Sequence, residues 1–221
     1  MIHNVKSIRA NGKDAYKDFD LLIDSRNTPL PDAKEILDSV PFQHGSYDFS
    51  AMYGEVAYSE RTISYSFDIA EASIQAMDQV KRDFTKWLMS IRECDIFDDY
   101  VPNYHFRGTA ISPDWKEDAS QGKITAKFRV YPFMIANEPT IFNFSVNSAV
   151  LQPFEIVNNS SHSIVPRFVS TAPFSIKIGN MTFSMPTGES SNNNVKFPPG
   201  KYNISLSGTA EVNISFFEEV F

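Results

Sequence analysis

The sequence predicts a mainly β fold with one α-helix, arranged in two domains. Apolar residues alternate with a period of two in several stretches, one stretch has helical spacing instead, and the charged fraction falls sharply near residue 139. A chain of 221 residues is long enough for one large or two small domains. It holds 19 Phe, nine Tyr and two Trp residues, a composition too apolar for a disordered protein.

The first half, residues 1–138, combines strands with the helix, which is predicted over about 73–92. Ser73 is a plausible N-cap, and Asp68 is an earlier alternative. The apolar residues of the helix recur at spacings of three, four and seven, which predicts a core-facing stripe: Ile74, Met77, Phe84, Leu88 and Ile91. Alternation predicts strands at 63–69 and 124–130, with shorter candidates at 19–23 and 104–111.

Between residues 24 and 43 the periodicity disappears. Pro29, Pro31 and Pro41 fall within this stretch, and proline removes a backbone donor and favours extended chain. A segment of this length without its own pattern is either mobile or packed on something else. We therefore expect an arm over about 24–43.

The second half, residues 139–221, reads as an all-β sandwich or jelly-roll of about 80 residues. Its charged residues are four basic and five acidic, against 16 and 22 in residues 1–138, a shift typical of a domain boundary. Two hairpins are predicted, one pairing 174–178 with 181–185 around Gly179-Asn180, the other pairing 202–206 with 212–216 around Gly208. Further strands are expected at 154–157, 166–170 and 195–197.

The chemistry-bearing residues do not form a recognisable catalytic or metal-binding pattern. The four histidines are widely spaced, Cys94 is the single cysteine, and no phosphate-loop or nucleophile-elbow motif occurs. The acid pairs Asp98-Asp99 and Glu218-Glu219 fit solvated turns better than a glycosidase site. We expect no enzyme activity, no cofactor and no metal.

The net charge and the hydropathy of the chain limit the classes of partner that it can bind. A net charge of −7 argues against nucleic-acid binding, and no apolar run approaches the length of a membrane span. The start of the sequence lacks a secretory apolar region, so we expect a soluble chain without membrane partners. A glycan-binding module is the main alternative, although both tryptophans lie in the first half and Phe is a poor sugar platform.

The order of several motifs resembles the distal tail protein family of long-tailed phages and prophages of Gram-positive bacteria. The resemblance covers most of residues 1–135. It rests on these pieces taken in order: Ser25-Arg26-Asn27-Thr28-Pro29-Leu30-Pro31-Asp32-Ala33-Lys34, Val40-Pro41, Gly45-Ser46-Tyr47-Asp48-Phe49-Ser50, Arg61-Thr62-Ile63, Lys86-Trp87-Leu88, Asp98-Asp99 and Tyr131-Pro132-Phe133. Asn158-Asn159-Ser160 and Val165-Pro166-Arg167-Phe168 are similar to the start of the family's second, galectin-like domain.

This resemblance implies a structural role without a cofactor. The first domain, a split β-barrel with a helix, would form a homohexameric ring stacked on the tail tube protein at the virion tail tip. The galectin-like second domain would carry receptor-binding or baseplate components, and the ring would dock a tail-associated spike or lysin protein. The chain is too short to hold the large inserted carbohydrate-binding domains of some members.

The arm is the predicted subunit interface, because extended segments with few local partners are best ordered by a neighbouring copy. Six copies would carry a formal charge of −42, and acids facing the hole would repel DNA from the wall. The ten Phe of the second half predict an apolar patch that meets a partner. The residues assigned to the subunit interface are Arg26, Pro29, Pro31, Tyr47 and Phe49.

Overall fold

The computed structural model describes residues 5–42, 44–52, 54–71, 73–118 and 121–221. The chain divides into two compact units, residues 1–134 together with Phe221, and residues 135–220. Each has its own cluster of buried apolar side chains. Among the described residues, no helix has the length and apolar character needed to cross a membrane.

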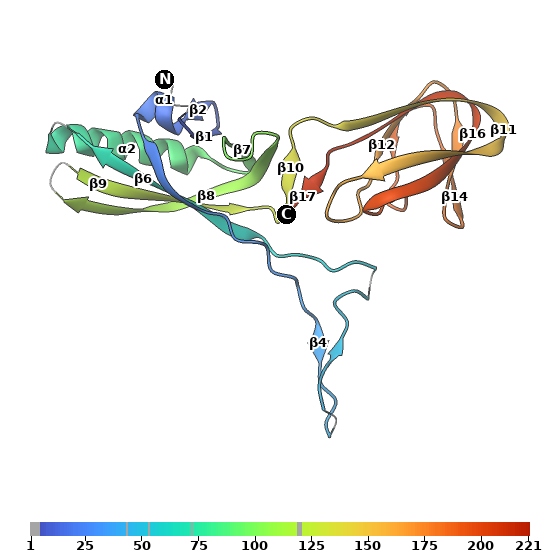
Figure 1. The fold of residues 1–221 in the computed structure, drawn as a ribbon, viewed down its shortest axis with the longest axis horizontal. Coiled ribbons are helices and arrows are strands. Elements are labelled where there is room, and N and C mark those ends of the chain that lie inside the picture. Colours follow the sequence, from blue (N-terminus) through green and yellow to red (C-terminus); the bar gives the residue numbers. More distant parts are fainter. Residues whose placement is uncertain (1–4, 43, 53, 72, 119–120) are drawn as a thin grey trace. The chain divides into compact units, whose positions relative to one another are not determined.

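The first unit is built on an antiparallel sheet with a helix packed on it (Figure 1). The core face of β6 carries Ile63, Tyr65 and Phe67, all fully buried, as the alternating pattern predicts. The strands follow the order β2 (Lys13–Asp14), β1 (Ile8–Ala10), β7 (Cys94–Asp98), β8 (Tyr104–Asp118), β9 (Gln121–Val130), β6 (Arg61–Ala70) and β3 (Leu22–Asn27).

The main helix, α2 (Ile74–Ser90), begins after Ser73, whose hydroxyl accepts a hydrogen bond from the backbone N–H of Ala76. Met77, Phe84 and Leu88 are buried as the spacing predicts. Ile74 does not join them. It occupies the first turn, ahead of the packed face, and is 58% exposed.

A second, shorter helix that the sequence did not predict, α1 (Ala15–Phe19), replaces the start of the strand expected at 19–23. Asp14 caps it by accepting hydrogen bonds from the N–H groups of Tyr16 and Lys17. Asp20 ends it in the left-handed conformation, with φ of 55°. Strand β3 therefore begins only at Leu22 and runs to Asn27, inside the segment expected to be arm.

The second unit is organised around two long strands, β11 (Thr140–Asn158) and β16 (Gly200–Phe216), paired along most of their length. Two short strands, β10 (Met134–Ala136) and β17 (Glu219–Val220), pair with each other. The other strands extend the sheet from β16 in the order β14-β13-β16-β12-β15, with these bounds: β12 (Arg167–Ser170), β13 (Phe174–Ile178), β14 (Met181–Met185) and β15 (Gly188–Ser191).

The hairpin predicted around Gly179-Asn180 is confirmed, with Phe174 opposite Met185 and Ile178 opposite Met181. The hairpin predicted around Gly208 is wrong, because residues 200–216 form one continuous strand. Gly208 lies within it, opposite Ser148 of β11 and Phe174 of β13. A hairpin and a continuous strand both keep the even-numbered residues on one face, so the apolar pattern cannot distinguish these two arrangements.

Two further expectations for the second unit change in detail. Residues 154–157 belong to the long strand β11. Residues 195–197 form no strand and contribute only an isolated bridge between Phe197 and Ile164. The buried Val195 and Phe197 side chains explain the apolar signal, because these residues fill the core without joining a ladder.

Candidate assembly interface

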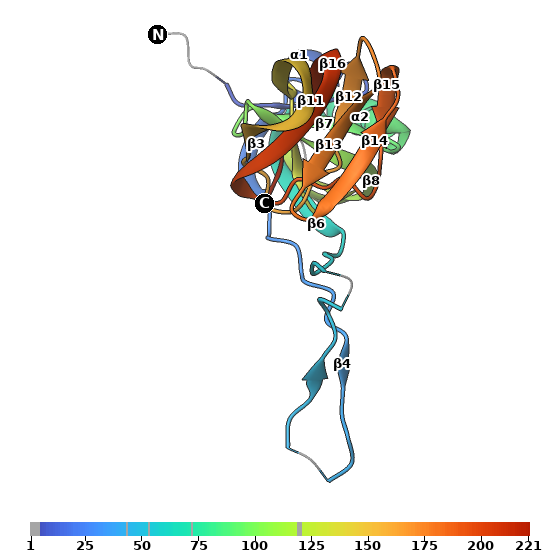
Figure 2. The ribbon, with the colours of Figure 1, turned by 90° about the vertical axis from the view of Figure 1, so that its right-hand side faces the viewer.

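The arm is the segment 28–60, which leaves the first unit after β3 and returns into β6 (Figure 1). It is longer than predicted, because the predicted arm ends at Gln43 and the returning half of the ribbon lies after that residue. Gln43 itself lies outside the described residues. The two halves run antiparallel as a narrow ribbon (Figure 2). Its only named strands among the described residues are β4 (Leu37–Asp38) and β5 (Tyr47–Asp48).

A few backbone hydrogen bonds hold the arm together. The N–H of Lys34 donates to the carbonyl of Ala57 at 2.7 Å, and the N–H of Phe49 donates to that of Ile36 at 2.8 Å. Nearer the sheet, Ala33 and Tyr58 form an isolated bridge. The arm is therefore a hydrogen-bonded ribbon, but a ribbon of two strands has no third element on which to bury side chains.

The arm exposes a series of large apolar side chains. Phe42, near its tip, has no cover at all from the described residues. Each uncovered square ångström of apolar surface forgoes roughly 25 cal/mol of hydrophobic stabilisation, and contiguous exposed patches usually mark interaction sites. The exposed apolar residues of the arm are Leu30, Ile36, Leu37, Val40, Phe42, Tyr47, Phe49 and Met52.

The root of the arm, in contrast, is fixed by buried polar contacts. The Asp98 carboxylate is fully buried and accepts hydrogen bonds from Arg26 Nε and the Tyr65 hydroxyl, each at 2.7 Å. Tyr65 also faces Arg26 across the β3–β6 ladder. Burial and the nearby Asp98 charge raise the pKa of Tyr65, so its hydroxyl keeps its proton and donates.

Arg61 completes the root where the arm re-enters the sheet. Its Nη1 donates to the carbonyl of Pro29 at 2.9 Å, which ties the outgoing strand to the returning one. Its guanidinium stacks over the Phe106 ring, and its Nε and Nη2 are buried without an acceptor in the described part of the chain. Burial, followed by the repulsion of Arg26, lowers the pKa of Arg61.

The segment that contains most of the sheet, the helix α2 and the arm matches a known protein family. Residues 17–130, more than half of the chain, match the model of the phage tail protein RIFT-related domain. The chain belongs to this phage tail protein family. No curated protein matches the sequence.

Comparison with solved structures extends the similarity to nearly the whole chain. SPP1 Dit (gp 19.1), described as a paradigm of the hub adsorption apparatus in phages that infect Gram-positive bacteria, aligns with a TM-score of 0.76 at 12% identity. The alignment covers 99% of this chain and all of that one. The phage p2 baseplate in its activated conformation with strontium aligns over 96% of this chain, with a TM-score of 0.43 and 9% identity.

The likeness to SPP1 Dit confirms the predicted fold class, a β-rich first domain with a helix followed by a second β domain. It also confirms the resemblance to distal tail proteins that the ordered motifs indicate. As a member of a phage tail protein family, the chain has a structural role in the tail.

The structure places the five predicted interface residues of this tail protein in two groups. Arg26 and Pro29 lie at the root, engaged with Asp98 and Arg61. Pro31 lies on the outgoing half of the arm, and Tyr47 and Phe49 lie on the returning half with ring centroids 6.4 Å apart. Whether a neighbouring copy contacts them stays a prediction.

Sequence reasoning missed most of the apolar residues of the arm. Leu37 and Phe42 stand between prolines and polar residues, where no period of two or 3.6 marks them. The sequence signal that could have identified the arm as two antiparallel halves is Gly45. It lies near the tip, where its φ is 86°. A glycine between two stretches of similar composition is typical of a chain reversal.

The acid pairs, which the sequence predicts in solvated turns, make specific side-chain contacts in the structure. Asp98 is the buried acceptor at the root, whereas Asp99 is partly exposed and pairs with Arg9 at 3.1 Å. Glu218 and Glu219 accept hydrogen bonds from Asn159 and His162 in the second unit. In the described part of the chain, no three His, Cys, Asp or Glu side chains converge as metal ligands would.

Proposed function

We propose that this phage tail protein is a non-enzymatic baseplate hub component that forms a homohexameric ring. The ring would connect the tail tube protein to the tail-tip and receptor-binding machinery and let DNA pass through its centre. Family membership and the fold shared with SPP1 Dit support the tail role. The proposed location is the virion tail tip, after assembly in the host cytoplasm.

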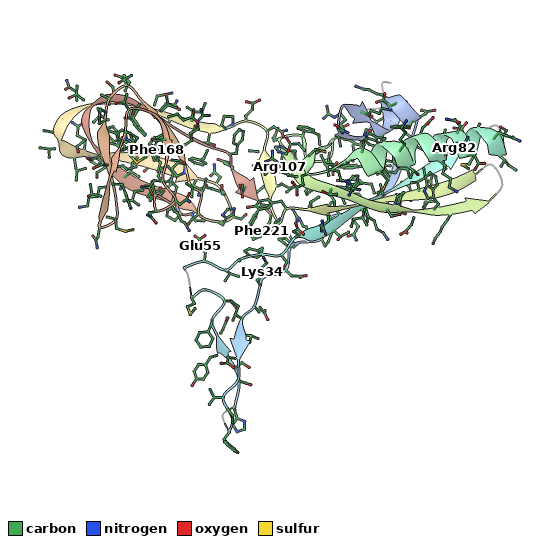
Figure 3. All side chains as sticks on the ribbon, turned by 180° about the vertical axis from the view of Figure 1, so that it is seen from behind. Lys34, Glu55, Arg82, Arg107, Phe168 and Phe221 are labelled. Carbon is green, nitrogen blue, oxygen red and sulfur yellow. The ribbon has the colours of Figure 1, made fainter. Side chains whose placement is uncertain are left out.

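One observation carries the self-association. Eight large apolar side chains of the arm are exposed, as Figure 3 shows for the side chains along it. The sheet, in contrast, buries its apolar face completely at Ile63, Phe67 and Phe128. A chain that packs its core this well and still exposes an ordered apolar ribbon has a surface suited to a partner, and a symmetric ring supplies identical partners.

The acidic charge fits a DNA conduit. Six copies would carry a formal charge of −42, and carboxylates on the wall of the hole would repel phosphates rather than hold them. The protein would therefore bind no specific nucleic-acid sequence. A ring structure with a hole lined by Lys and Arg would contradict this part of the proposal.

The second unit would meet the other tail components, a tail-associated spike or lysin protein and a receptor-binding protein. Its exposed apolar residues Ile141, Val150 and Val169 offer surface for such contacts. We favour such protein contacts over glycan binding, the alternative weighed from the sequence. The single tyrosine of the unit, Tyr202, packs on Phe197 and has a buried hydroxyl, so it provides no exposed sugar platform.

The test is deletion of the arm followed by mass measurement under native conditions. Residues 28–60 are replaced by a short Gly-Asn turn, which β3 and β6 can accept because they already run antiparallel. We expect the full chain to give a sixfold species and the deletion variant to give folded monomers. A ring that survives the deletion overturns the proposal.

A matched pair of variants separates the arm from general surface effects. Leu37→Ser and Phe42→Ser remove apolar surface from the arm, whereas Ile141→Ser and Val150→Ser remove exposed apolar surface from the second unit. The arm pair should lower the fraction of sixfold species, and the second-unit pair should leave it unchanged. Equal losses from both pairs would show that the arm has no special role.

A further inference from the structure

The charge of the arm indicates which surface of a neighbouring copy receives it, an inference that rests on the proposed self-association. Residues 28–60 hold six acidic side chains and a single lysine, which gives the arm a formal charge of −5 of the total −7. The arm is thus both apolar and strongly acidic. A complementary surface must combine cations with apolar contact area.

One groove of the first unit has this combination. It has a volume of about 630 Å³ and lies between α2 and the part of β8 where the ladder with β9 shifts register. Ser112 and Pro113 form this irregularity, which turns β8 locally away from regular pairing. Trp115 follows it and packs partly against the core of the unit.

Three cations from α2 line the groove beside these apolar groups. The Lys81 ammonium lies over the Trp115 ring, 5.2 Å from its centroid. Arg82, labelled on α2 in Figure 3, donates to the Gln79 amide, and neither Arg82 nor Lys86 forms an ion pair with any described residue. Asp78 is the single acid in the lining, so the groove has a net positive charge in an acidic protein.

Two other grooves of the first unit lack this balance. The groove of about 750 Å³ between α1 and α2, which shares Lys86 with the α2–β8 groove, has three lysines opposed by four acids. The groove of about 370 Å³ near Arg107 and Arg129 is neutralised by Glu60 and Glu93. An acidic ribbon would meet like charges in both, and like charges brought together at an interface cost several kcal/mol.

We propose that the arm of one copy lies in the α2–β8 groove of the neighbouring copy in the ring. Acidic side chains of the arm, among them Glu35 and Asp38, would pair with Arg82 and Lys86. Apolar side chains of the arm would pack on Trp115 and Pro113. The contact would bury the apolar surface that the arm exposes in a single copy.

The first test is photo-crosslinking in full-length protein that mixes ¹⁴N-labelled and ¹⁵N-labelled copies. A benzophenone amino acid replaces Phe42, which is fully exposed, and mass spectrometry identifies the attached peptide and its isotope. We expect mixed-isotope cross-links to residues 78–86 or 112–116. Cross-links confined to one copy, cross-links to another surface, or no cross-link at the highest attainable concentration each overturn the proposal.

The second test reverses charge in the groove. Arg82→Glu with Lys86→Glu should weaken self-association by about tenfold or more, measured by sedimentation at low salt. Lys13→Glu with Lys17→Glu changes the net charge equally in a different groove and should have little effect. Adding Glu35→Lys and Asp38→Lys to the reversed groove should restore association, and added salt should weaken the wild-type contact.

The outcomes of these tests are distinguishable from those of the arm deletion. If deletion of the arm abolishes the ring but cross-links and charge reversal point elsewhere, the arm joins the copies through another surface and the α2–β8 groove is the wrong receptor. If the ring survives without the arm, the proposed self-association fails at the earlier step. Rescue by the arm reversal is the result that a merely structural role of Arg82 and Lys86 would not produce.

Discussion

The arm of the first unit and the β11–β16 pair of the second are both long antiparallel ribbons, and their side chains have opposite environments. Along β16, every second residue from Ile204 to Phe216 is buried except Gly208, because β12 and β13 extend the sheet beside it. Along the arm, no further strand is present among the described residues, and Leu37 and Tyr47 are exposed. A ribbon needs an additional partner, and the arm does not find one within its unit.

The largest effect is expected at the root of the arm, which resembles the interior of β16 more than the arm itself. Asp98→Ala would leave Arg26 and Tyr65 without their shared acceptor and should cost about 3–5 kcal/mol of unfolding free energy. Urea unfolding followed by tryptophan fluorescence reports on the first unit alone, because Trp87 and Trp115 both lie there.

Asp99→Ala is the matched control for this change. Asp99 is the next residue and also binds an arginine, but its side chain is 30% exposed and Arg9 is half exposed. It also accepts a hydrogen bond from the backbone N–H of Ser7, so the loss should be about 1–2 kcal/mol, smaller than at Asp98. Tyr65→Phe removes only the hydroxyl donor and should fall between the two. Equal losses for Asp98 and Asp99 would mean that the root is not held by its buried carboxylate.

The next prediction compares the loss of one apolar side chain in each of the two ribbons. Ile214→Ala removes a fully buried side chain of β16 and should destabilise the second unit by about 2–5 kcal/mol. Leu37→Ala makes a similar truncation on the arm, where the side chain is exposed, and should change stability by less than about 0.5 kcal/mol. Amide hydrogen exchange of the full chain can follow both units in one sample.

Comparable losses in the two variants would contradict this difference. A large loss at Leu37 would show that the arm already packs within its own copy, and a small loss at Ile214 would show that the long strand tolerates a cavity. Self-association provides a second readout. It should weaken for Leu37→Ala and stay unchanged for Ile214→Ala at temperatures where both variants are folded.

A smaller effect is expected at Gly208, the residue that the sequence placed in a turn. Its φ of 135° is strained for other residues, and an added Cβ would lie 3.2 Å from the Pro173 carbonyl oxygen. Gly208→Ala should therefore cost about 1–3 kcal/mol. Gly188→Ala, also at positive φ but with open space around it, should cost less, which thermal unfolding of the two variants can measure.

The sequence predicted those elements whose pattern is decided locally. The turn at Gly179-Asn180 fixed its own register, and the helical stripe marked the buried Met77, Phe84 and Leu88. Gly208 could not be interpreted in the same way, because a hairpin and a continuous strand place the same side chains inward. Only the long-range pairing of β16 with β11 decides between them.

The candidate interface was predictable only in part, for a related reason. Missing periodicity and three prolines indicated an arm, but exposed apolar residues such as Phe42 and Met52 follow no internal pattern that would identify them. Arg26 illustrates the opposite difficulty. It belongs to a motif of the arm in sequence, whereas its side chain is engaged by Asp98, which lies 72 residues further along the chain.

The charge of the arm has a consequence for copies that have not yet assembled. A two-stranded ribbon with open edges is a ready template for pairing with another copy of itself, which would lead to open-ended aggregates. At −5, two arms repel each other before their edges can meet, most strongly at low ionic strength. The acids that would attract an arm to a basic surface thus also keep free copies from sticking to one another.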